Sequence, residues 1–163
     1  MHDEPPPAYR QTFAALANAL QGSLGHRLFT VSRLVPGAGA VERIFTTRAD
    51  VYPLHGRKPV DQSEWTAQMA RGECFIANQP EAFGEHFGDL DTIESMGLGA
   101  VINIPVHDGS RQVGSLNLLD AAGAYQGDVL PACHEAGQAA IQGFAEYEQF
   151  LVRSVPDSTL SKE

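Results

Sequence analysis

Two apolar segments joined by a short polar connection constrain this chain more than any other feature. Residues 99–106 and 112–119 are rich in aliphatic side chains, and His107, Asp108, Gly109 and Ser110 lie between them. An Asp-Gly pair between two apolar runs is a strong signal for a tight turn, because glycine accepts the backbone angles that such turns require. The segments therefore predict an antiparallel β-hairpin.

Helical and strand-like patterns alternate along the rest of the chain. The predicted elements are a helix over 8–22, strands over 28–35 and 41–47 joined by a turn at 36–39, a short helix with Trp65 and Met69 that Asp61 or Ser63 caps, a strand over 74–77, short helices or an ordered loop over 79–97, the hairpin, and an amphipathic helix over 127–153. Hairpins without a repeated strand–helix–strand unit favour an α+β fold, with helices packed on one face of an antiparallel sheet.

One domain is expected over residues 8–154, because a single hydrophobic core commonly serves about 100–200 residues. Pro5, Pro6 and Pro7 have no amide hydrogens and do not propagate a helix or a sheet. Residues 1–7 are therefore predicted to be a disordered leader. Residues 155–163 are small, polar or charged, and are predicted to form a flexible tail.

Charge and hydrophobicity argue against two classes of partner. The formal net charge is -9, and the basic residues form no stripe along which a polyanion could bind. Nucleic acid and anionic lipid surfaces are therefore disfavoured by electrostatic repulsion. No apolar run approaches the ~20 residues that span a bilayer, and no signal-peptide pattern is present. The sequence predicts a cytoplasmic protein that binds neither nucleic acid nor membranes.

The hairpin and the segments around it resemble the GAF domain family. A glycine-led strand that ends near a proline occupies Met96–Val106, and the next strand, Val113–Asp120, carries the small "xGxLxL" run of that family. Residues 72–78 look like the family's third strand. The matching positions of the second strand and the aromatic residue after it are Gly114, Leu116, Leu118 and Tyr125.

The resemblance extends over residues 9–153 and implies an architecture. This is a five- or six-stranded antiparallel sheet with the N- and C-terminal helices on one face, and short helices or loops over the other. A ligand pocket between the sheet and the short helices, and dimerisation through the terminal helices, are also implied. The last helix carries small residues, Ala136, Ala139 and Ala140, beside Phe144. This composition agrees with a homodimer.

The resemblance does not identify a ligand, and no cofactor follows from the sequence. Cyclic-nucleotide-binding members often carry an Asn-Lys pair followed by a phenylalanine, whereas here a leucine follows Asn117 and Tyr125 replaces the phenylalanine. Members that attach a bilin use a cysteine of the pocket helices, and no cysteine lies between Cys74 and Cys133. Both departures argue against these ligand classes.

A binding pocket needs aromatic walls for contact area and a few polar groups to orient a ligand. Asn103 and Asn117 are the most informative candidates, because a carboxamide on the buried face of a strand costs free energy unless it is hydrogen-bonded. Strand alternation places Asn117 on the same face as Ser115, and that face is either buried or in solvent. The predicted ligand-binding residues are Trp65, Phe83, Phe87, Asp89, Thr92, Met96, Asn103, Ser115 and Asn117.

No catalytic residues are predicted. The histidines show no metal-ligand spacing, so no metal site is expected. Cys74 and Cys133 are interpreted as reduced, buried packing residues. The enzymatic GAF relatives, the free methionine sulfoxide reductases, need two thiols close together in the pocket.

Together these patterns favour a sensory or regulatory domain that binds an unidentified small molecule in signal transduction without catalysis. Two alternatives stay open. One is an enzyme similar to the free methionine-(R)-sulfoxide reductases, and the other is an interaction or dimerisation module without a ligand.

Overall fold

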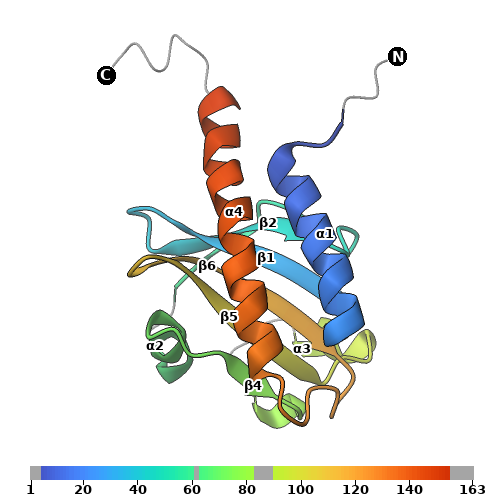
Figure 1. The fold of residues 1–163 in the computed structure, drawn as a ribbon. Helices are drawn as coiled ribbons and strands as arrows, with labels where there is room; N and C mark the ends of the chain where they lie inside the picture. The colour runs from blue at the N-terminus through green and yellow to red at the C-terminus, as the bar shows by residue number, and fades with distance from the viewer. Residues whose placement is uncertain (1–4, 61–62, 83–89, 155–163) are drawn as a thin grey trace.

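A six-stranded antiparallel sheet forms the centre of the fold in the computed structural model, which describes residues 5–60, 63–82 and 90–154 (Figure 1). The strand order across the sheet is β3-β2-β1-β6-β5-β4. The strands are β1 (Leu28–Val35), β2 (Ala40–Thr46), β3 (Arg57–Pro59), β4 (Phe75–Ala77), β5 (Ala100–Asp108) and β6 (Arg111–Asp120). The β5–β6 pair is the hairpin that the sequence predicts.

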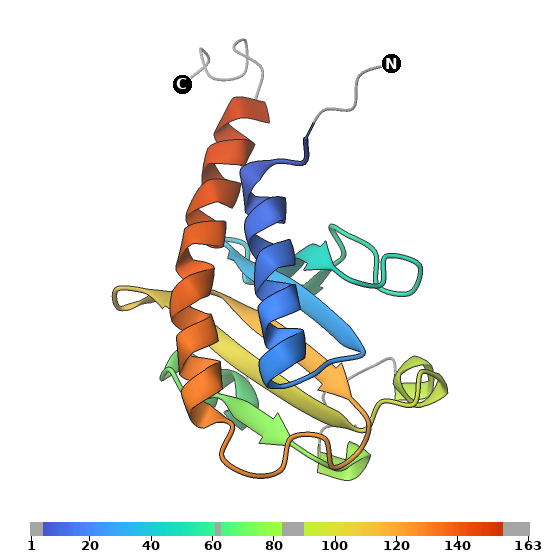
Figure 2. The same ribbon diagram turned by 45° about the vertical axis from the view of Figure 1, so that its right-hand side comes forward.

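The two terminal helices, α1 (Ala8–Ser23) and α4 (Leu130–Ser154), lie side by side over one face of the sheet (Figures 1 and 2). They run in opposite directions, and the start of α1 and the end of α4 project together beyond the sheet. The shorter helices α2 (Glu64–Ala70), η1 (Pro80–Ala82) and α3 (Leu90–Ser95) do not share this layer. The predicted α+β architecture is therefore confirmed. None of the described helices is long and apolar enough to cross a membrane.

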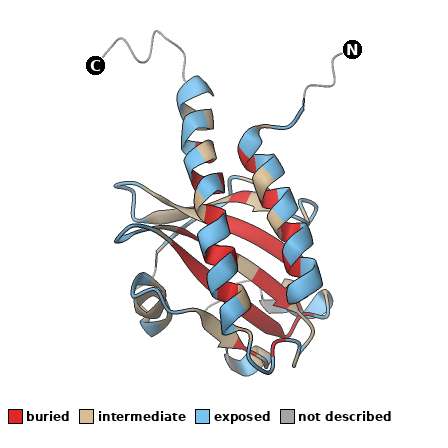
Figure 3. Ribbon diagram, in the orientation of Figure 1, coloured by how far each residue is buried: buried red, intermediate tan, exposed pale blue. Residues whose placement is uncertain are grey.

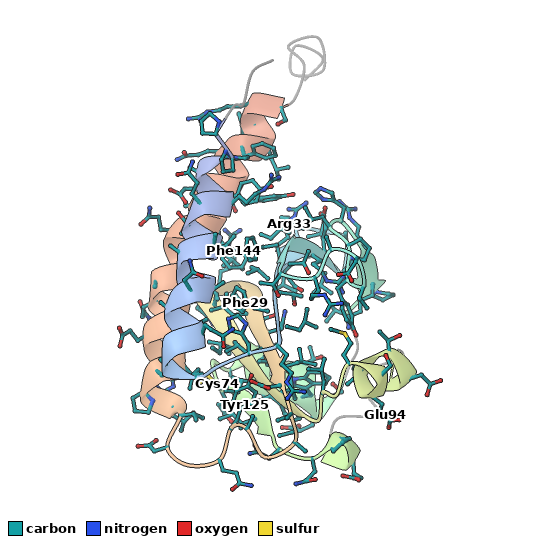
Figure 4. The ribbon with its side chains drawn as sticks, turned by 90° about the vertical axis from the view of Figure 1, so that its right-hand side faces the viewer. Phe29, Arg33, Cys74, Glu94, Tyr125 and Phe144 are labelled. Atoms are coloured by element: carbon teal, nitrogen blue, oxygen red, sulfur yellow. The ribbon has the colours of Figure 1, made fainter. Side chains whose placement is uncertain are left out.

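The main hydrophobic core fills the space between the terminal helices and the sheet, where the strands are buried (Figure 3). Phe29 of β1 and Phe144 of α4 lie in this layer (Figure 4). Phe13 of α1 is fully buried and meets Phe144 edge to face at a centroid distance of 5.5 Å. A smaller cluster packs on the opposite face and includes Ile93 of α3 and Leu98. The terminal helices thus cover one face of the sheet, and the smaller cluster packs on the other.

Three details differ from the sequence prediction or complete it. Strand β3 was not predicted, because its three residues are all exposed at the sheet edge and show no apolar alternation. Ser63 caps α2, since its Oγ accepts a hydrogen bond of 3.2 Å from the Thr66 amide; Asp61 lies outside the described residues. Helix α4 begins later than predicted, after Gly127, whose φ of 95° is left-handed and interrupts a helix. The predicted leader and tail fall mostly outside the described residues and stay predictions.

A buried carboxylate ties β2 to its neighbours on the helix-covered face. Glu42 is 5% exposed and accepts hydrogen bonds from Arg33 at 3.0 Å and Arg57 at 3.2 Å, and its Oε2 lies 2.7 Å from His55 Nδ1. Arg33 in turn stacks over the Tyr147 ring of α4 at 5.4 Å. Burial opposes ionisation of Glu42, but the hydrogen bonds from His55 and Arg33 outweigh it and hold the pKa of Glu42 below its usual value.

The Glu42→Gln variant is expected to lose about 2–3 kcal/mol of unfolding free energy at pH 7, because hydrogen bonds to a charged group contribute about that much. A lowered pKa means that the unfolded chain binds the proton more readily. The contribution of Glu42 is therefore complete above the unfolded pKa of about 4.3, and is lost as the pH falls through the folded pKa. Urea unfolding from pH 7 to pH 3 should show the two proteins converging at low pH. The control is Glu148→Gln at an exposed position, where the partner Arg111 lies 3.8 Å away, and it should cost less than about 0.5 kcal/mol. If the loss of unfolding free energy in Glu42→Gln were the same at every pH, the lowered pKa of Glu42 would be wrong.

Candidate functional site

The face of the sheet opposite the terminal helices carries a row of polar side chains across three central strands. In the strand register Thr30 of β1 pairs with Asn117 of β6, and Asn117 pairs with Asn103 of β5. Ser32 and Ser115 pair in the next row. Side chains at paired positions of neighbouring strands share a face, so the antiparallel register alone gathers these five residues.

Asn117 is the centre of the hydrogen-bond network in this row. Its Oδ1 accepts from Asn103 Nδ2 at 2.8 Å and from Ser115 Oγ at 3.1 Å. Its Nδ2 donates to Thr30 Oγ1 at 3.1 Å and to Ser32 Oγ at 3.4 Å. The network holds the carboxamide of Asn117 in one orientation, and Asn103 is oriented through it.

Asn103 presents a buried acceptor that the described residues leave without a hydrogen bond. The residue is 4% exposed, and none of the described residues donates a hydrogen bond to its Oδ1. A buried carbonyl oxygen without a partner costs about 1–3 kcal/mol. An unsatisfied acceptor beside a cavity is therefore a site at which a bound molecule with an N–H or O–H group gains free energy.

A cavity of about 170 Å³ lies against this polar row. One water needs about 10–15 Å³ of such space, so the cavity has room for a small organic molecule. Its other walls come from α2, β2, β3 and the loop between β2 and β3. The apolar and aromatic lining residues are Leu28, Leu34, Val41, Tyr52, Pro59, Val60, Trp65, Met69 and Leu119. The Trp65 ring packs on Phe75 at a centroid distance of 4.9 Å, and Phe75 pairs with Asn103 in the sheet.

Two cations stand on one side of the cavity. Arg43 of β2 and Lys58 of β3 both line it, and the described lining residues include no carboxylate. Arg43 also donates a hydrogen bond of 3.0 Å to the Pro53 carbonyl and stacks over the Tyr52 ring at 5.1 Å. The described lining residues thus include two positively charged side chains, in a chain whose formal net charge is -9.

Comparison with known proteins identifies solved structures that share the fold of this chain. No family model and no curated protein matches the chain. Among solved structures, the GAF domain/HD domain protein from Geobacter sulfurreducens has a TM-score of 0.66 at 12% identity, and the GAF domain of a two-component sensor histidine kinase from Bacillus halodurans has a TM-score of 0.63 at 12% identity. Both alignments cover 86% of this chain and 95% of the other. The chain has the fold of a GAF domain.

A third similar structure is the chromophore-binding domain of a bacteriophytochrome from R. palustris. Its TM-score is 0.66 at 14% identity, and the alignment covers 86% of this chain and 57% of that one. Identities at this level support the shared fold.

The structure brings four of the predicted ligand-binding residues to the cavity: Trp65, Asn103, Ser115 and Asn117. Thr92 and Met96 do not line it. Met96 packs against the small apolar cluster around Ile93 because α3 lies beside Leu28, Leu98 and Val101 rather than over the polar row. Phe83, Phe87 and Asp89 lie outside the described residues. The sequence left open whether Asn103 and Asn117 point to a buried face or to solvent. In the structure both face the cavity.

Sequence reasoning missed the contribution of the first two strands to the site. Thr30 and Ser32 lie on the cavity side of β1, whereas Phe29 and Val31 lie in the main core. The alternation of outward and inward positions over residues 28–34 is visible in the sequence, and it could have identified Thr30 and Ser32 as residues of the site. Arg43 and Lys58 gave no comparable signal, because their position depends on the pairing of β3 with β2.

The cysteines also differ from the prediction. Cys133 is buried as expected, but Cys74 is partly exposed. Neither lines the cavity, since both face a separate groove beside α4. Among the described residues, no group of three or more His, Cys, Asp or Glu side chains is placed to hold a metal ion.

Proposed function

We propose that this GAF domain is a sensory module that binds a small organic molecule in the cavity beside Asn103 and acts in signal transduction without catalysis. The observation that carries the proposal is the buried, unused Oδ1 of Asn103 at the wall of a mostly apolar cavity. The similar structures support the sensory part, since they include a domain of a sensor histidine kinase and a chromophore-binding domain.

The lining favours a ligand with three features. An apolar, preferably flat body would contact Trp65 and the aliphatic walls, and an N–H or O–H group would donate to Asn103. Arg43 and Lys58 favour an anionic substituent on their side of the cavity. Heterocycles with a ring N–H and small carboxylates with an amino or hydroxyl group share this chemistry.

A thermal-shift screen tests the proposal, because a ligand present at 100 times its dissociation constant stabilises the folded state by about 2.7 kcal/mol. The probes are nucleotides, purines, amino acids, methionine sulfoxide and 2-oxo acids, each against buffer alone. A shift with any of these classes, confirmed by calorimetry, supports a binding domain. The absence of a shift in every class would favour the interaction module without a ligand.

The Asn103→Leu variant is expected to bind the ligand found by that screen about 3–10 times more weakly, the loss of one neutral hydrogen bond. Its stability without ligand should stay within about 1 kcal/mol of the parent, because the substitution also removes an unsatisfied buried acceptor. Calorimetric titration of both proteins measures the ratio of the dissociation constants. The Met96→Leu variant is the matched control, since Met96 was predicted to bind ligand but packs outside the cavity; a loss in that variant equal to the loss in Asn103→Leu would contradict the site.

Two observations favour binding over the sulfoxide reductase alternative. The described lining of the cavity contains no cysteine, and the two thiols lie on the helix-covered side of the sheet. A sulfoxide in the cavity would therefore be separated from both thiols by the sheet. Turnover of free methionine sulfoxide that is lost in Cys74→Ser would overturn this preference.

A homodimer through the terminal helices remains part of the proposal. Two small residues of α4, Ala136 and Ala140, are buried within this protomer, whereas Ala139 is exposed. Val152 is 64% exposed at the projecting end of α4. Sedimentation equilibrium that gives the monomer mass at micromolar concentration would exclude the dimer.

A further inference from the structure

Two cysteines that are far apart in the sequence meet at the end of the helix-covered face. Cys74 directly precedes β4, and Cys133 lies in the first turn of α4. Both are free thiols, both line one groove beside α4, and Cys74 packs against the core cluster that contains Cys133. Figure 4 shows Cys74 beside Tyr125, at the end of the layer between the helices and the sheet. A disulfide needs Cα atoms about 4.4–6.8 Å apart, a separation that two cysteines packed in one cluster can reach.

The surroundings of the pair allow one thiol to meet a solute. A groove of about 440 Å³ runs past both sulfur atoms and is lined by exposed residues of the β5–β6 turn, of α4 and of the segment after α2, among them Arg71, Ser110 and His134. Cys74 is partly exposed there, whereas Cys133 is 0% exposed. A solute in the groove can therefore reach the Cys74 thiol, whereas the Cys133 thiol is shielded.

The two neighbouring thiols also differ in acidity. The neighbouring Cys133 thiol lowers the pKa of Cys74 despite the partial burial of Cys74. The neighbouring Cys74 and the burial of Cys133 raise the pKa of Cys133. The thiolate, which is the nucleophilic form of cysteine, thus forms at the accessible residue.

We propose that Cys74 and Cys133 form a site of reversible oxidation, at which a hydroperoxide converts the two thiols into an intramolecular disulfide. The Cys74 thiolate attacks one peroxide oxygen, the O–O bond breaks, and the other oxygen leaves as an alcohol or as water after taking a proton. Cys74 is then a sulfenic acid. The Cys133 sulfur attacks the Cys74 sulfur, the S–O bond breaks, and water leaves with the Cys133 proton. The two thiols lose two electrons, and the peroxide gains them.

The disulfide would connect the last helix to the strand that supports the cavity. Phe75 follows Cys74, stacks against Trp65 and pairs with Asn103. Cys133 belongs to the helix that packs along α1. Oxidation would therefore restrain α4 relative to one wall of the cavity, whether or not a ligand is bound there.

Treatment of the reduced protein with an equimolar amount of hydrogen peroxide tests the proposal. Intact-mass spectrometry should show the loss of two hydrogens, and a non-reduced digest should contain one peptide pair joined through Cys74 and Cys133. Dithiothreitol should restore the thiols. Because the bond closes a long loop of the unfolded chain, the oxidised protein should melt at least about 5 °C higher than the reduced protein. Amide hydrogen exchange in the first turn of α4 should slow.

Two variants assign the roles of the thiols. In Cys133→Ala, or in Cys133→Ser if the alanine variant does not fold, Cys74 should stop at a sulfenic acid that dimedone captures. In Cys74→Ala the remaining Cys133 should react with peroxide at least about ten times more slowly than Cys74 does in the parent. Disulfides between chains, conversion of parent Cys74 to a sulfinic acid without a cross-link, or equal reactivity of Cys133 in Cys74→Ala would each overturn the proposal.

Discussion

Gly114→Ala is expected to lower the free energy of unfolding by at least about 3 kcal/mol, the upper end of the cost of overpacking a core. Gly114 lies in β6 between Arg33 of β1 and Val106 of β5. A methyl group there would overlap the Ser32 carbonyl oxygen and stand 2.6 Å from the Phe144 ring. The carbonyl belongs to the neighbouring strand, so relief requires β1 and β6 to separate. Differential scanning calorimetry should show a melting temperature lower by about 6–12 °C.

Gly22→Ala is the matched control for this substitution. Gly22 lies in α1, and a methyl group at this position would have no atom within 4 Å. Alanine is about 1 kcal/mol more favourable than glycine within a helix, so this variant should be as stable as the parent or more stable. If Gly114→Ala melted at the temperature of the parent, the close approach of β1, β6 and α4 would be wrong, and with it the register that aligns the polar row.

The central strands and the terminal helices could be predicted from local patterns, because each carries its signal within a few residues. The Asp-Gly turn determines the β5–β6 hairpin, and the apolar stripe from Tyr9 to Leu20 determines α1. Strand β3 could not be predicted in this way, since its residues pair with β2 only through the fold. Short edge strands owe their position to a partner strand rather than to their own side chains.

The candidate site, too, could be predicted from the sequence only in part. Asn103 and Asn117 were identifiable because a carboxamide within an apolar strand needs a buried partner. Their mutual hydrogen bond depends on the register of β5 and β6, which the turn determines. The sequence also suggested Thr92 and Met96 as ligand-binding residues, but the described walls of the cavity come instead from α2, β2, β3 and the loop between β2 and β3. The position of Cys74 and Cys133 in one groove was equally invisible, because the two residues lie far apart in the sequence.

Phe13→Ala is expected to cost about 3–5 kcal/mol, the usual range for the removal of a fully buried aromatic ring. Phe13 is 0% exposed and contacts the rings of Tyr9, Phe45 and Phe144, so the cavity left behind has walls on both the helices and the sheet. Chemical denaturation of the variant measures this loss. A cost below about 1 kcal/mol would mean that α1 is not fixed against the sheet through this ring.

Gly143 supplies a second mutation that reports on the same contact. A methyl group at Gly143 would lie 2.5 Å from the Phe13 ring, which its aromatic neighbours hold in place. Gly143→Ala alone should therefore destabilise the protein, because the clash exceeds the gain of about 1 kcal/mol in helix propensity. In the Phe13→Ala background the ring is absent, so the same methyl group occupies vacant space and the propensity gain remains. The double-mutant cycle should give a coupling of at least about 1.5 kcal/mol, with a change of sign for Gly143→Ala between the two backgrounds. Additive effects would contradict the direct packing of α1 on α4, which makes the two terminal helices a single layer over the sheet.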